Sequence, residues 1–285
     1  MAVTNFVPDI WSARILSNLS RMAVSGACVN RNYEGDVARA GDSVKITNFV
    51  DPTIGSYTAH SDITIEDIDD ATQSLLINQQ KYFAFELDDV ERAQSVNGGA
   101  VMDEQIKRAS YGLKNTLDAF VFTTMAAGAS ATAPDHQVAE ATISTASDAY
   151  LALVNWSVLL DQADIPEEER FAVVTPAFHG LLLKDDRFVK AGDDLAAATR
   201  QNGRVGQAAG FDIFKSNNLP DGAGAGAGKA MIAGYRGATT LAEQIVSVEA
   251  FRLEKRFADG VKGLHVYGAK VTRATGLVVA DVIVS

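Results

Sequence analysis

The 285-residue chain lacks the residues on which several kinds of functional site depend. Its single cysteine, Cys28, excludes an intrachain disulfide and a cysteine-rich zinc site. Cys28 could be a nucleophile, but the first histidine in the sequence is His60. We therefore interpret Cys28 as a small buried apolar residue. Four histidines are present, and no two of them have the spacing of paired metal ligands. The sequence therefore predicts neither a metal nor a cofactor.

Long apolar runs are also missing. The longest, such as Leu181–Leu183 and Leu277–Ala280, fall far short of the roughly 20 residues that a membrane helix needs. The N-terminus has neither a basic start nor an apolar segment, so we see no signal peptide. We expect a chain that is cytoplasmic when it is synthesised, with no membrane partner.

Basic clusters are equally scarce in a chain whose formal net charge is −11. The longest basic run is a pair, Lys107-Arg108 or Lys255-Arg256. Proteins that bind nucleic acid usually present a basic patch to the phosphates, so we expect no sequence-specific DNA binding. An acidic chain can nevertheless lie beside DNA without adhering to it.

Motifs of catalysis are absent too. The run GAGAGAGK at 222–229 approaches a phosphate-binding loop, which needs a glycine at 223 and a hydroxyl residue at 230. Ala223 and Ala230 stand there instead, and a dinucleotide-binding glycine pattern fails at Ala227. There is no Gly-x-Ser-x-Gly elbow. We interpret the run as a flexible hairpin tip and expect no enzymatic activity.

The chain does contain clear periodic patterns, and at 47% hydrophobic residues it can form a core. Helical spacing predicts a long helix over Ala100–Ala127, a second over Ser147–Ala163 and a third that begins at Thr175-Pro176. The stripe of the long helix consists of Met102, Ile106, Ala109, Leu113, Leu117, Phe120 and Met125.

Strand alternation predicts the rest of the fold. Short strands are expected near 43–50, 171–175, 211–216 and 230–235, and the C-terminal 40 residues read almost entirely as strand. We further expect a short helix near Thr239–Gln244 and an exposed loop over 190–210. The fold class is mixed α+β.

An acidic hairpin is the most unusual segment. Residues 51–70 contain six acids, and no lysine or arginine occurs between Lys45 and Lys81. Alternation resumes at Phe83, Phe85 and Leu87, so the hairpin is expected to return through 71–88. An isolated two-stranded hairpin is at best marginally stable in water, which leaves either a solvated hairpin or an arm that lies on a partner subunit.

The N-terminal segment offers a second contact candidate. Trp11, Ile15, Leu19 and Met22 recur at helical spacing and predict a short amphipathic helix. An aromatic anchor such as Trp11 is more often docked than exposed. It would dock equally well on its own subunit or on another.

Four segments in this order resemble tailed-phage major capsid proteins with the HK97-like fold. They are FVPDIWSARIL followed by VNRNYEGDVARAGDSVKI, then RFAVVTPAFHGLLLKDDRFV, then GRVGQAAGFDIFKSNNLP, and finally VEAFRLEKRFADGVKGLHVYGAKVTRATGLVV. The resemblance implies a domain plan. It consists of an N-terminal arm (1–40), an extended loop with flanking strands (41–90), a peripheral domain with a long spine helix (91–135 and 246–285) and an axial domain (136–245).

The resemblance also implies the function: self-assembly of pentamers and hexamers into an icosahedral virion shell around packaged double-stranded DNA. Some members cross-link the extended loop through a lysine, but this hairpin has none, so we expect no cross-link at its tip. The chain begins directly with the arm, so we expect a separate scaffolding protein and a portal. An encapsulin-like compartment, an accessory virion protein such as a tail subunit, and a small enzyme with an unrecognised site remain alternatives.

Charge suggests which residues meet between subunits. The acidic hairpin requires a basic surface, and the spine helix and last strands supply one. We hypothesise that acids of the hairpin face some of these bases on a neighbouring subunit. The acids are Glu66, Asp67, Asp69 and Asp70, and the bases include Lys107, Arg108, Arg252, Lys255, Arg256, Lys262, Lys270 and Arg273.

Overall fold

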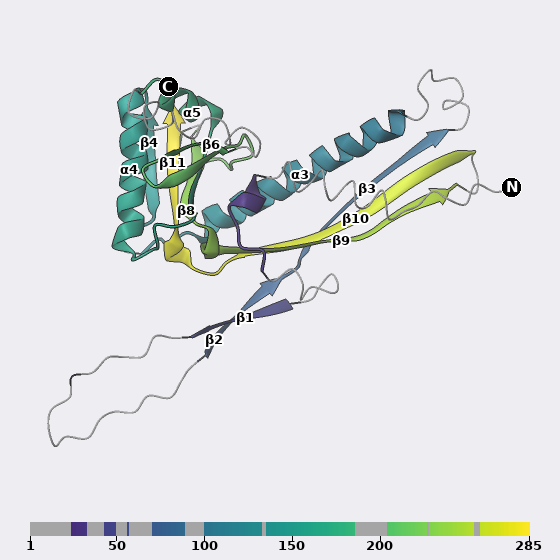
Figure 1. The fold of residues 1–285 in the computed structure, drawn as a ribbon, viewed down its shortest axis with the longest axis horizontal. Helices are drawn as coiled ribbons and strands as arrows, with labels where there is room; N and C mark the ends of the chain where they lie inside the picture. The colour runs from purple at the N-terminus through teal and green to yellow at the C-terminus, as the bar shows by residue number, and fades with distance from the viewer. Residues whose placement is uncertain are drawn as a thin grey trace.

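A computed structural model describes residues 24–32, 43–49, 56, 70–88, 100–132, 135–185, 204–226, 228–253 and 257–285. Its elements form a body at one end, a long layer of one helix and three strands that extends from it, and a hairpin that projects away from both (Figure 1). The expected α+β class is confirmed, and each part rests on a recognisable sequence pattern.

The body is a mixed six-stranded sheet with two helices packed on it. The sheet order is β4-β11-β8-β5-β7-β6. The strands span Gln137–Ile143 (β4), Arg170–Val174 (β5), Arg204–Ala208 (β6), Phe211–Lys215 (β7), Lys229–Tyr235 (β8) and Leu277–Val284 (β11). β5 reads Arg-Phe-Ala-Val-Val and is buried throughout, as expected of a central strand.

The two body helices begin at capping threonines. Thr145 and Thr175 each accept a backbone N–H bond at the start of α4 (Ala146–Gln162) and α5 (Pro176–Leu182). Trp156 of α4 stacks on Phe178 of α5, with ring centroids 5.9 Å apart. Both side chains are buried in the main apolar core, which the sheet and both helices share. The predicted helix–strand–helix segment is therefore confirmed.

The long layer consists of α3 (Ala100–Gly128) and a three-stranded sheet of order β3-β10-β9. The strands span Gln79–Asp88 (β3), Ala258–Val271 (β10) and Thr239–Arg252 (β9). The predicted long helix is confirmed, and Ile106, Leu113 and Leu117 of its stripe are buried. Phe120 contacts Tyr267 of β10 edge-to-face at 5.3 Å, so α3 covers one face of this sheet.

Three predictions are wrong. Residues 239–244 form the start of β9 because Thr239 and Thr240 are β-branched and pair with Val271 and Lys270 of β10. The expected loop over 190–210 extends too far, since 204–208 forms β6. The hairpin does not return through 71–88: β2 (Asp70–Leu76) pairs with β1 (Ser43–Phe49) and ends there, and β3 pairs instead with β10.

Candidate assembly surfaces

Within the described residues, the β1–β2 hairpin contacts the rest of the chain at its base. Its register runs without interruption from the Ser43–Leu76 pair to the Phe49–Asp70 pair. Ile46, Leu75 and Ile77 are buried against Ala242 and Val266 in a small second core. Beyond this core the hairpin points away from the body and the long layer (Figure 1). This arrangement leaves both strands in a position to contact a neighbouring subunit.

Bonds from the end of β10 secure that base. The Lys270 ammonium donates to the Ser74 carbonyl at 3.0 Å, and the Gln73 side chain donates to the Thr272 carbonyl at 3.2 Å. Gly268 lies directly under the Leu76 carbonyl, where a Cβ would overlap the backbone. These contacts with backbone carbonyl groups therefore fix the position at which the hairpin leaves the sheet.

Among the predicted contact residues, the acids are mostly untested. Asp70 is the first residue of β2, opposite Phe49. The other predicted acids and the aromatic anchor lie outside the described residues: Trp11, Glu66, Asp67 and Asp69.

The predicted bases that the structure describes are dispersed over the long layer. Arg252 pairs with Asp259 at 2.8 Å, and Lys262 pairs with Glu249 at 2.8 Å, so both have partners within the chain. Lys107 and Arg108 are exposed in the first half of α3. Lys255 and Arg256 lie outside the described residues.

Residues 24–32, which we call the strap, are bonded to α3 and to the start of β9. Asp118 of α3 accepts bonds from the Ser25 hydroxyl at 2.6 Å and the Ser25 amide at 3.1 Å. Asn30 pairs with the start of β9, and the Arg236 guanidinium donates to the Ala27 carbonyl at 2.5 Å. The strap thus ties α3 to the β8–β9 corner. Cys28 lies in it fully buried, as predicted.

Two buried carboxyl groups bind the strap, and their pKa values are shifted in opposite directions. Burial raises the pKa of Asp118 above its ordinary value, although bonds from Ser25 oppose the shift. Glu243 of β9 pairs with Arg31 of the strap and lies 3.6 Å from the buried imidazole of His265. Burial alone would raise the pKa of Glu243, but the contacts with His265 and Arg31 outweigh it and lower the pKa. Acid therefore affects the two anchors differently.

The glycine-rich run closes a hairpin between Asp221 and Lys229, as expected of a hairpin tip, and two carboxylates bind its backbone. The Gly224 amide donates to the Asp281 carboxylate at 2.6 Å, and the Gly226 amide donates to Glu140 at 2.9 Å. A Cβ at Gly222 or Gly224 would overlap these carboxylates, so the alternating glycines let the loop close over them. Its backbone N–H groups bind anions, as those of a phosphate loop do, but the anions belong to the chain itself.

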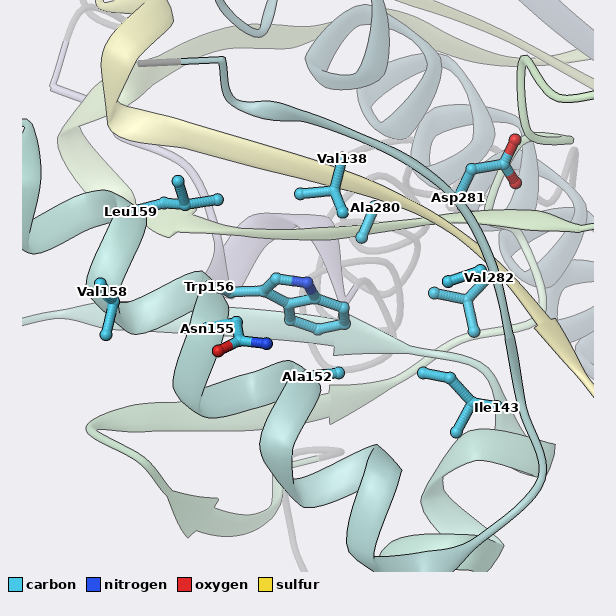
Figure 2. Close-up of a pocket in the computed structure, with 11 residues that line it drawn as sticks. Val138, Ile143, Ala152, Asn155, Trp156, Val158, Leu159, Ala280, Asp281 and Val282 are labelled. Carbon is cyan, nitrogen blue, oxygen red and sulfur yellow. The ribbon is translucent and has the colours of Figure 1, made fainter. Parts of the chain in front are cut away.

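An apolar cavity of about 350 Å³ opens between α4 and the β4–β11 edge of the body sheet (Figure 2). Trp156 forms its floor, with Val138 and Ala280 above it and Leu159 at one side. Leu151 and Val158 on α4 are about half exposed, at 48% and 45%. The cavity contains no cluster of acid–base groups, and no described group of His, Cys, Asp or Glu could hold a metal ion.

Sequence reasoning missed β4, the strap and the carboxylate contacts of the glycine loop. β4 is largely exposed at the edge of the sheet, so its residues lack clean alternation. The contacts of Asp118, Glu243 and Asp281 join positions 57 to 212 residues apart, which no local pattern records. Among the described helices, none has the length and apolar character needed to cross a membrane.

Comparison with known proteins identifies the family. A family model described as phage capsid protein matches residues 37–280. The chain belongs to the phage capsid protein family. A search of curated protein sequences found no match.

Solved structures agree with this phage capsid assignment. The chain is 29% identical to a protein of Mycobacterium phage Che8, with 98% of each chain covered and a TM-score of 0.70. It also resembles the capsid protein of cyanophage P-SCSP1u at 17% identity, with 91% and 87% covered and a TM-score of 0.67. A mature capsid chain of bacteriophage PhiM1 matches at 16% identity, with 84% and 82% covered and a TM-score of 0.62.

The chain therefore has the HK97-like fold, and it is a structural protein of the phage head. As a major capsid protein it associates with copies of itself and forms the head shell, so it resides in the virion. The surfaces described above are candidates for that association.

Proposed function

We propose that this capsid protein forms pentamers and hexamers that close into the icosahedral head of a tailed phage, around double-stranded DNA that it encloses without reading its sequence. The match over residues 37–280 carries the proposal. Assembly takes place in the host cytoplasm with a separate scaffolding protein and a portal. The protein has no catalytic role.

The domain plan expected from the sequence is part of this proposal. The strap begins at Val24, within the arm (1–40), and the projecting hairpin falls within the extended loop (41–90). α3 begins the peripheral domain (91–135 and 246–285), and the body sheet belongs chiefly to the axial domain (136–245). β11 is the exception, since this C-terminal strand lies inside the body sheet.

The extended hairpin supplies the main contact between subunits in this proposal. Its acids face the β9–β10 turn of a neighbour, where Arg252, Lys255 and Arg256 follow one another closely in sequence. Arg252 is half exposed, so its ion pair with Asp259 leaves it accessible. Each exposed pair contributes only about 0.2–1 kcal/mol, but a shell repeats the contact in every subunit.

Electron microscopy and size-exclusion chromatography of the purified protein test the proposal. Closed polyhedral particles are expected, either from the protein alone or after co-expression with a scaffolding protein. A small, discrete oligomer that persists with the scaffold would contradict it.

Charge reversal tests the hairpin contact separately. Glu66→Lys with Asp67→Lys should impair shell formation while the subunit stays folded, as judged by circular dichroism. The matched control is Glu167→Lys with Glu168→Lys, which makes the same change on an exposed loop of the body. Normal shells from the hairpin variant would refute the contact.

A further inference from the structure

The long layer has two chemically different sides. α3 covers one face of the β3-β10-β9 sheet through Ile106, Leu113 and Leu117 and turns its opposite side outward. The other face of the sheet is open over its outer half, where Tyr82 is 80% exposed. A wall of this kind has one side toward the interior of the shell and one side toward the exterior.

The outward side of α3 is basic. Between Gln105 and Thr116 it carries Lys107, Arg108 and Lys114 and no acid. Tyr111 is half exposed between these bases, and the Lys114 ammonium lies 5.5 Å from its ring centroid. Positions 107, 111 and 114 follow the i, i+4, i+7 spacing that places side chains on one side of a helix. We call these four residues the α3 basic stripe.

The open sheet face has the opposite balance. Among the described residues, strand alternation places three acids on it, Glu86, Asp88 and Glu249, and one base, Lys262. The Lys262 ammonium is already paired with Glu249 and lies 5.6 Å from the Phe251 ring centroid. On the helix side of the same sheet, Lys81 adds to the positive charge, while Arg252 and Asp259 pair with each other. In a chain of net charge −11, the stripe is an exception.

We propose that the α3 basic stripe contacts the phosphate backbone of the packaged double-stranded DNA, so that the helix side of the layer is the inner wall of the shell. The proposal rests on the proposed function and adds to it the surface that meets the DNA. Lysine and arginine bind phosphates irrespective of base sequence, and a tyrosine hydroxyl can donate to a phosphate oxygen.

The size of the stripe sets the strength of the contact. Lys107 to Lys114 spans seven residues, or about 10 Å of helix, beside a duplex with one phosphate per roughly 1.7 Å of axis. Three cations neutralise at most about three of these phosphates, so a single subunit holds DNA weakly and reversibly. Many weak contacts keep an otherwise acidic wall compatible with dense DNA without fixing the DNA in one place.

Formaldehyde cross-linking of DNA-filled heads, followed by nuclease digestion and peptide mass spectrometry, tests the contact. Lys107 and Lys114 should carry nucleotide adducts, whereas Lys262, of the same chemistry on the opposite face, should carry none. Heads emptied of DNA provide the baseline. Adducts on Lys262 alone, or on none of the three lysines, would overturn the proposal while leaving shell formation intact.

A rival occupant, the acidic hairpin of a neighbouring subunit, is distinguished by carbodiimide cross-linking of the same heads. Intersubunit links between Lys107 and residues 51–70 would overturn the DNA contact; their absence beside nucleotide adducts supports it. Variants give a second readout. Filled heads with Lys107→Gln and Lys114→Gln should release DNA on heating at a lower temperature than wild type, and Lys262→Gln should not change it. Equal release temperatures in all three would also count against the stripe.

Discussion

The body and the long layer with its hairpin are stabilised in different ways. In the body, strands and helices enclose one core in which Trp156, Phe171 and Phe178 are almost fully buried. The base of the hairpin has a separate core of five buried residues. On the outer half of the three-stranded sheet, Tyr82 is 80% exposed. The body therefore has a large core of its own, whereas the described extended part has little, and we expect contacts with other subunits to add to its burial.

Truncation of each core gives the largest expected effect and the clearest test of this contrast. Phe178→Ala should destabilise the unassembled subunit by about 3–5 kcal/mol, since it leaves a cavity between α4, α5 and the sheet. Leu75→Ala, equally buried, should leave the main thermal transition almost unchanged but reduce shell yield. Calorimetry and particle counts measure the two effects. Equal losses of stability would show that hairpin and body unfold as one unit.

Glycine substitutions, one in the body and one in the long layer, sharpen the contrast. Gly222→Ala should cost about 1–3 kcal/mol because the new methyl group overlaps the Asp281 carboxylate. Gly112→Ala on exposed α3 has no atom within 4 Å of its Cβ and should stabilise the helix by up to about 1 kcal/mol. Chemical denaturation of both variants compares them. A neutral Gly222 variant would mean that the loop readily opens.

The strap joins the two regions and should be sensitive at Asp118. Asp118→Ala leaves the Ser25 amide and hydroxyl without their partner, at a cost of about 1–3 kcal/mol. Thr123→Ala, which removes an exposed bond within the same helix, should change stability by less than about 0.5 kcal/mol. Limited proteolysis near residue 24 should be faster only in the Asp118 variant. Identical digestion rates would show that the strap is held by its other contacts.

The smallest expected effect is on pH dependence: the stability contributions of Asp118 and Glu243 should change in opposite directions as the pH falls. The raised pKa of Asp118 means that its contribution is greatest below the unfolded value of about 3.9 and is lost as pH rises through the folded pKa. The lowered pKa of Glu243 means that its contribution is present above about 4.3 and is lost as pH falls through the folded pKa.

Melting temperatures measured between pH 3 and pH 7 for wild type, Asp118→Asn and Glu243→Gln check these signs. The advantage of wild type over Glu243→Gln should shrink on acidification. Its advantage over Asp118→Asn should shrink as the pH rises. Parallel curves for all three proteins would contradict both assignments.

The sequence by itself determined the long helix, the helix–strand–helix segment and the C-terminal strands. Each of these is set by local spacing: the stripe through Ile106, Leu113 and Leu117, the Thr175-Pro176 start and the apolar runs of β5 and β11. Together with the four resembling segments, these patterns were enough to indicate the capsid family. Cys28 could also be placed in the interior from its surroundings.

Only the tertiary structure decided where strands pair and where buried charges meet. Phe83 and Phe85 alternate equally well in a hairpin or beside β10, and the register of β3 is set by Gly263, which accommodates the Phe83 ring. Asp118, Glu243 and Asp281 look like surface acids in the sequence, since the amides and the arginine that satisfy them lie far away along the chain. Local patterns fix elements because they depend on neighbouring residues, whereas pairing and charge burial depend on what the folded chain brings together.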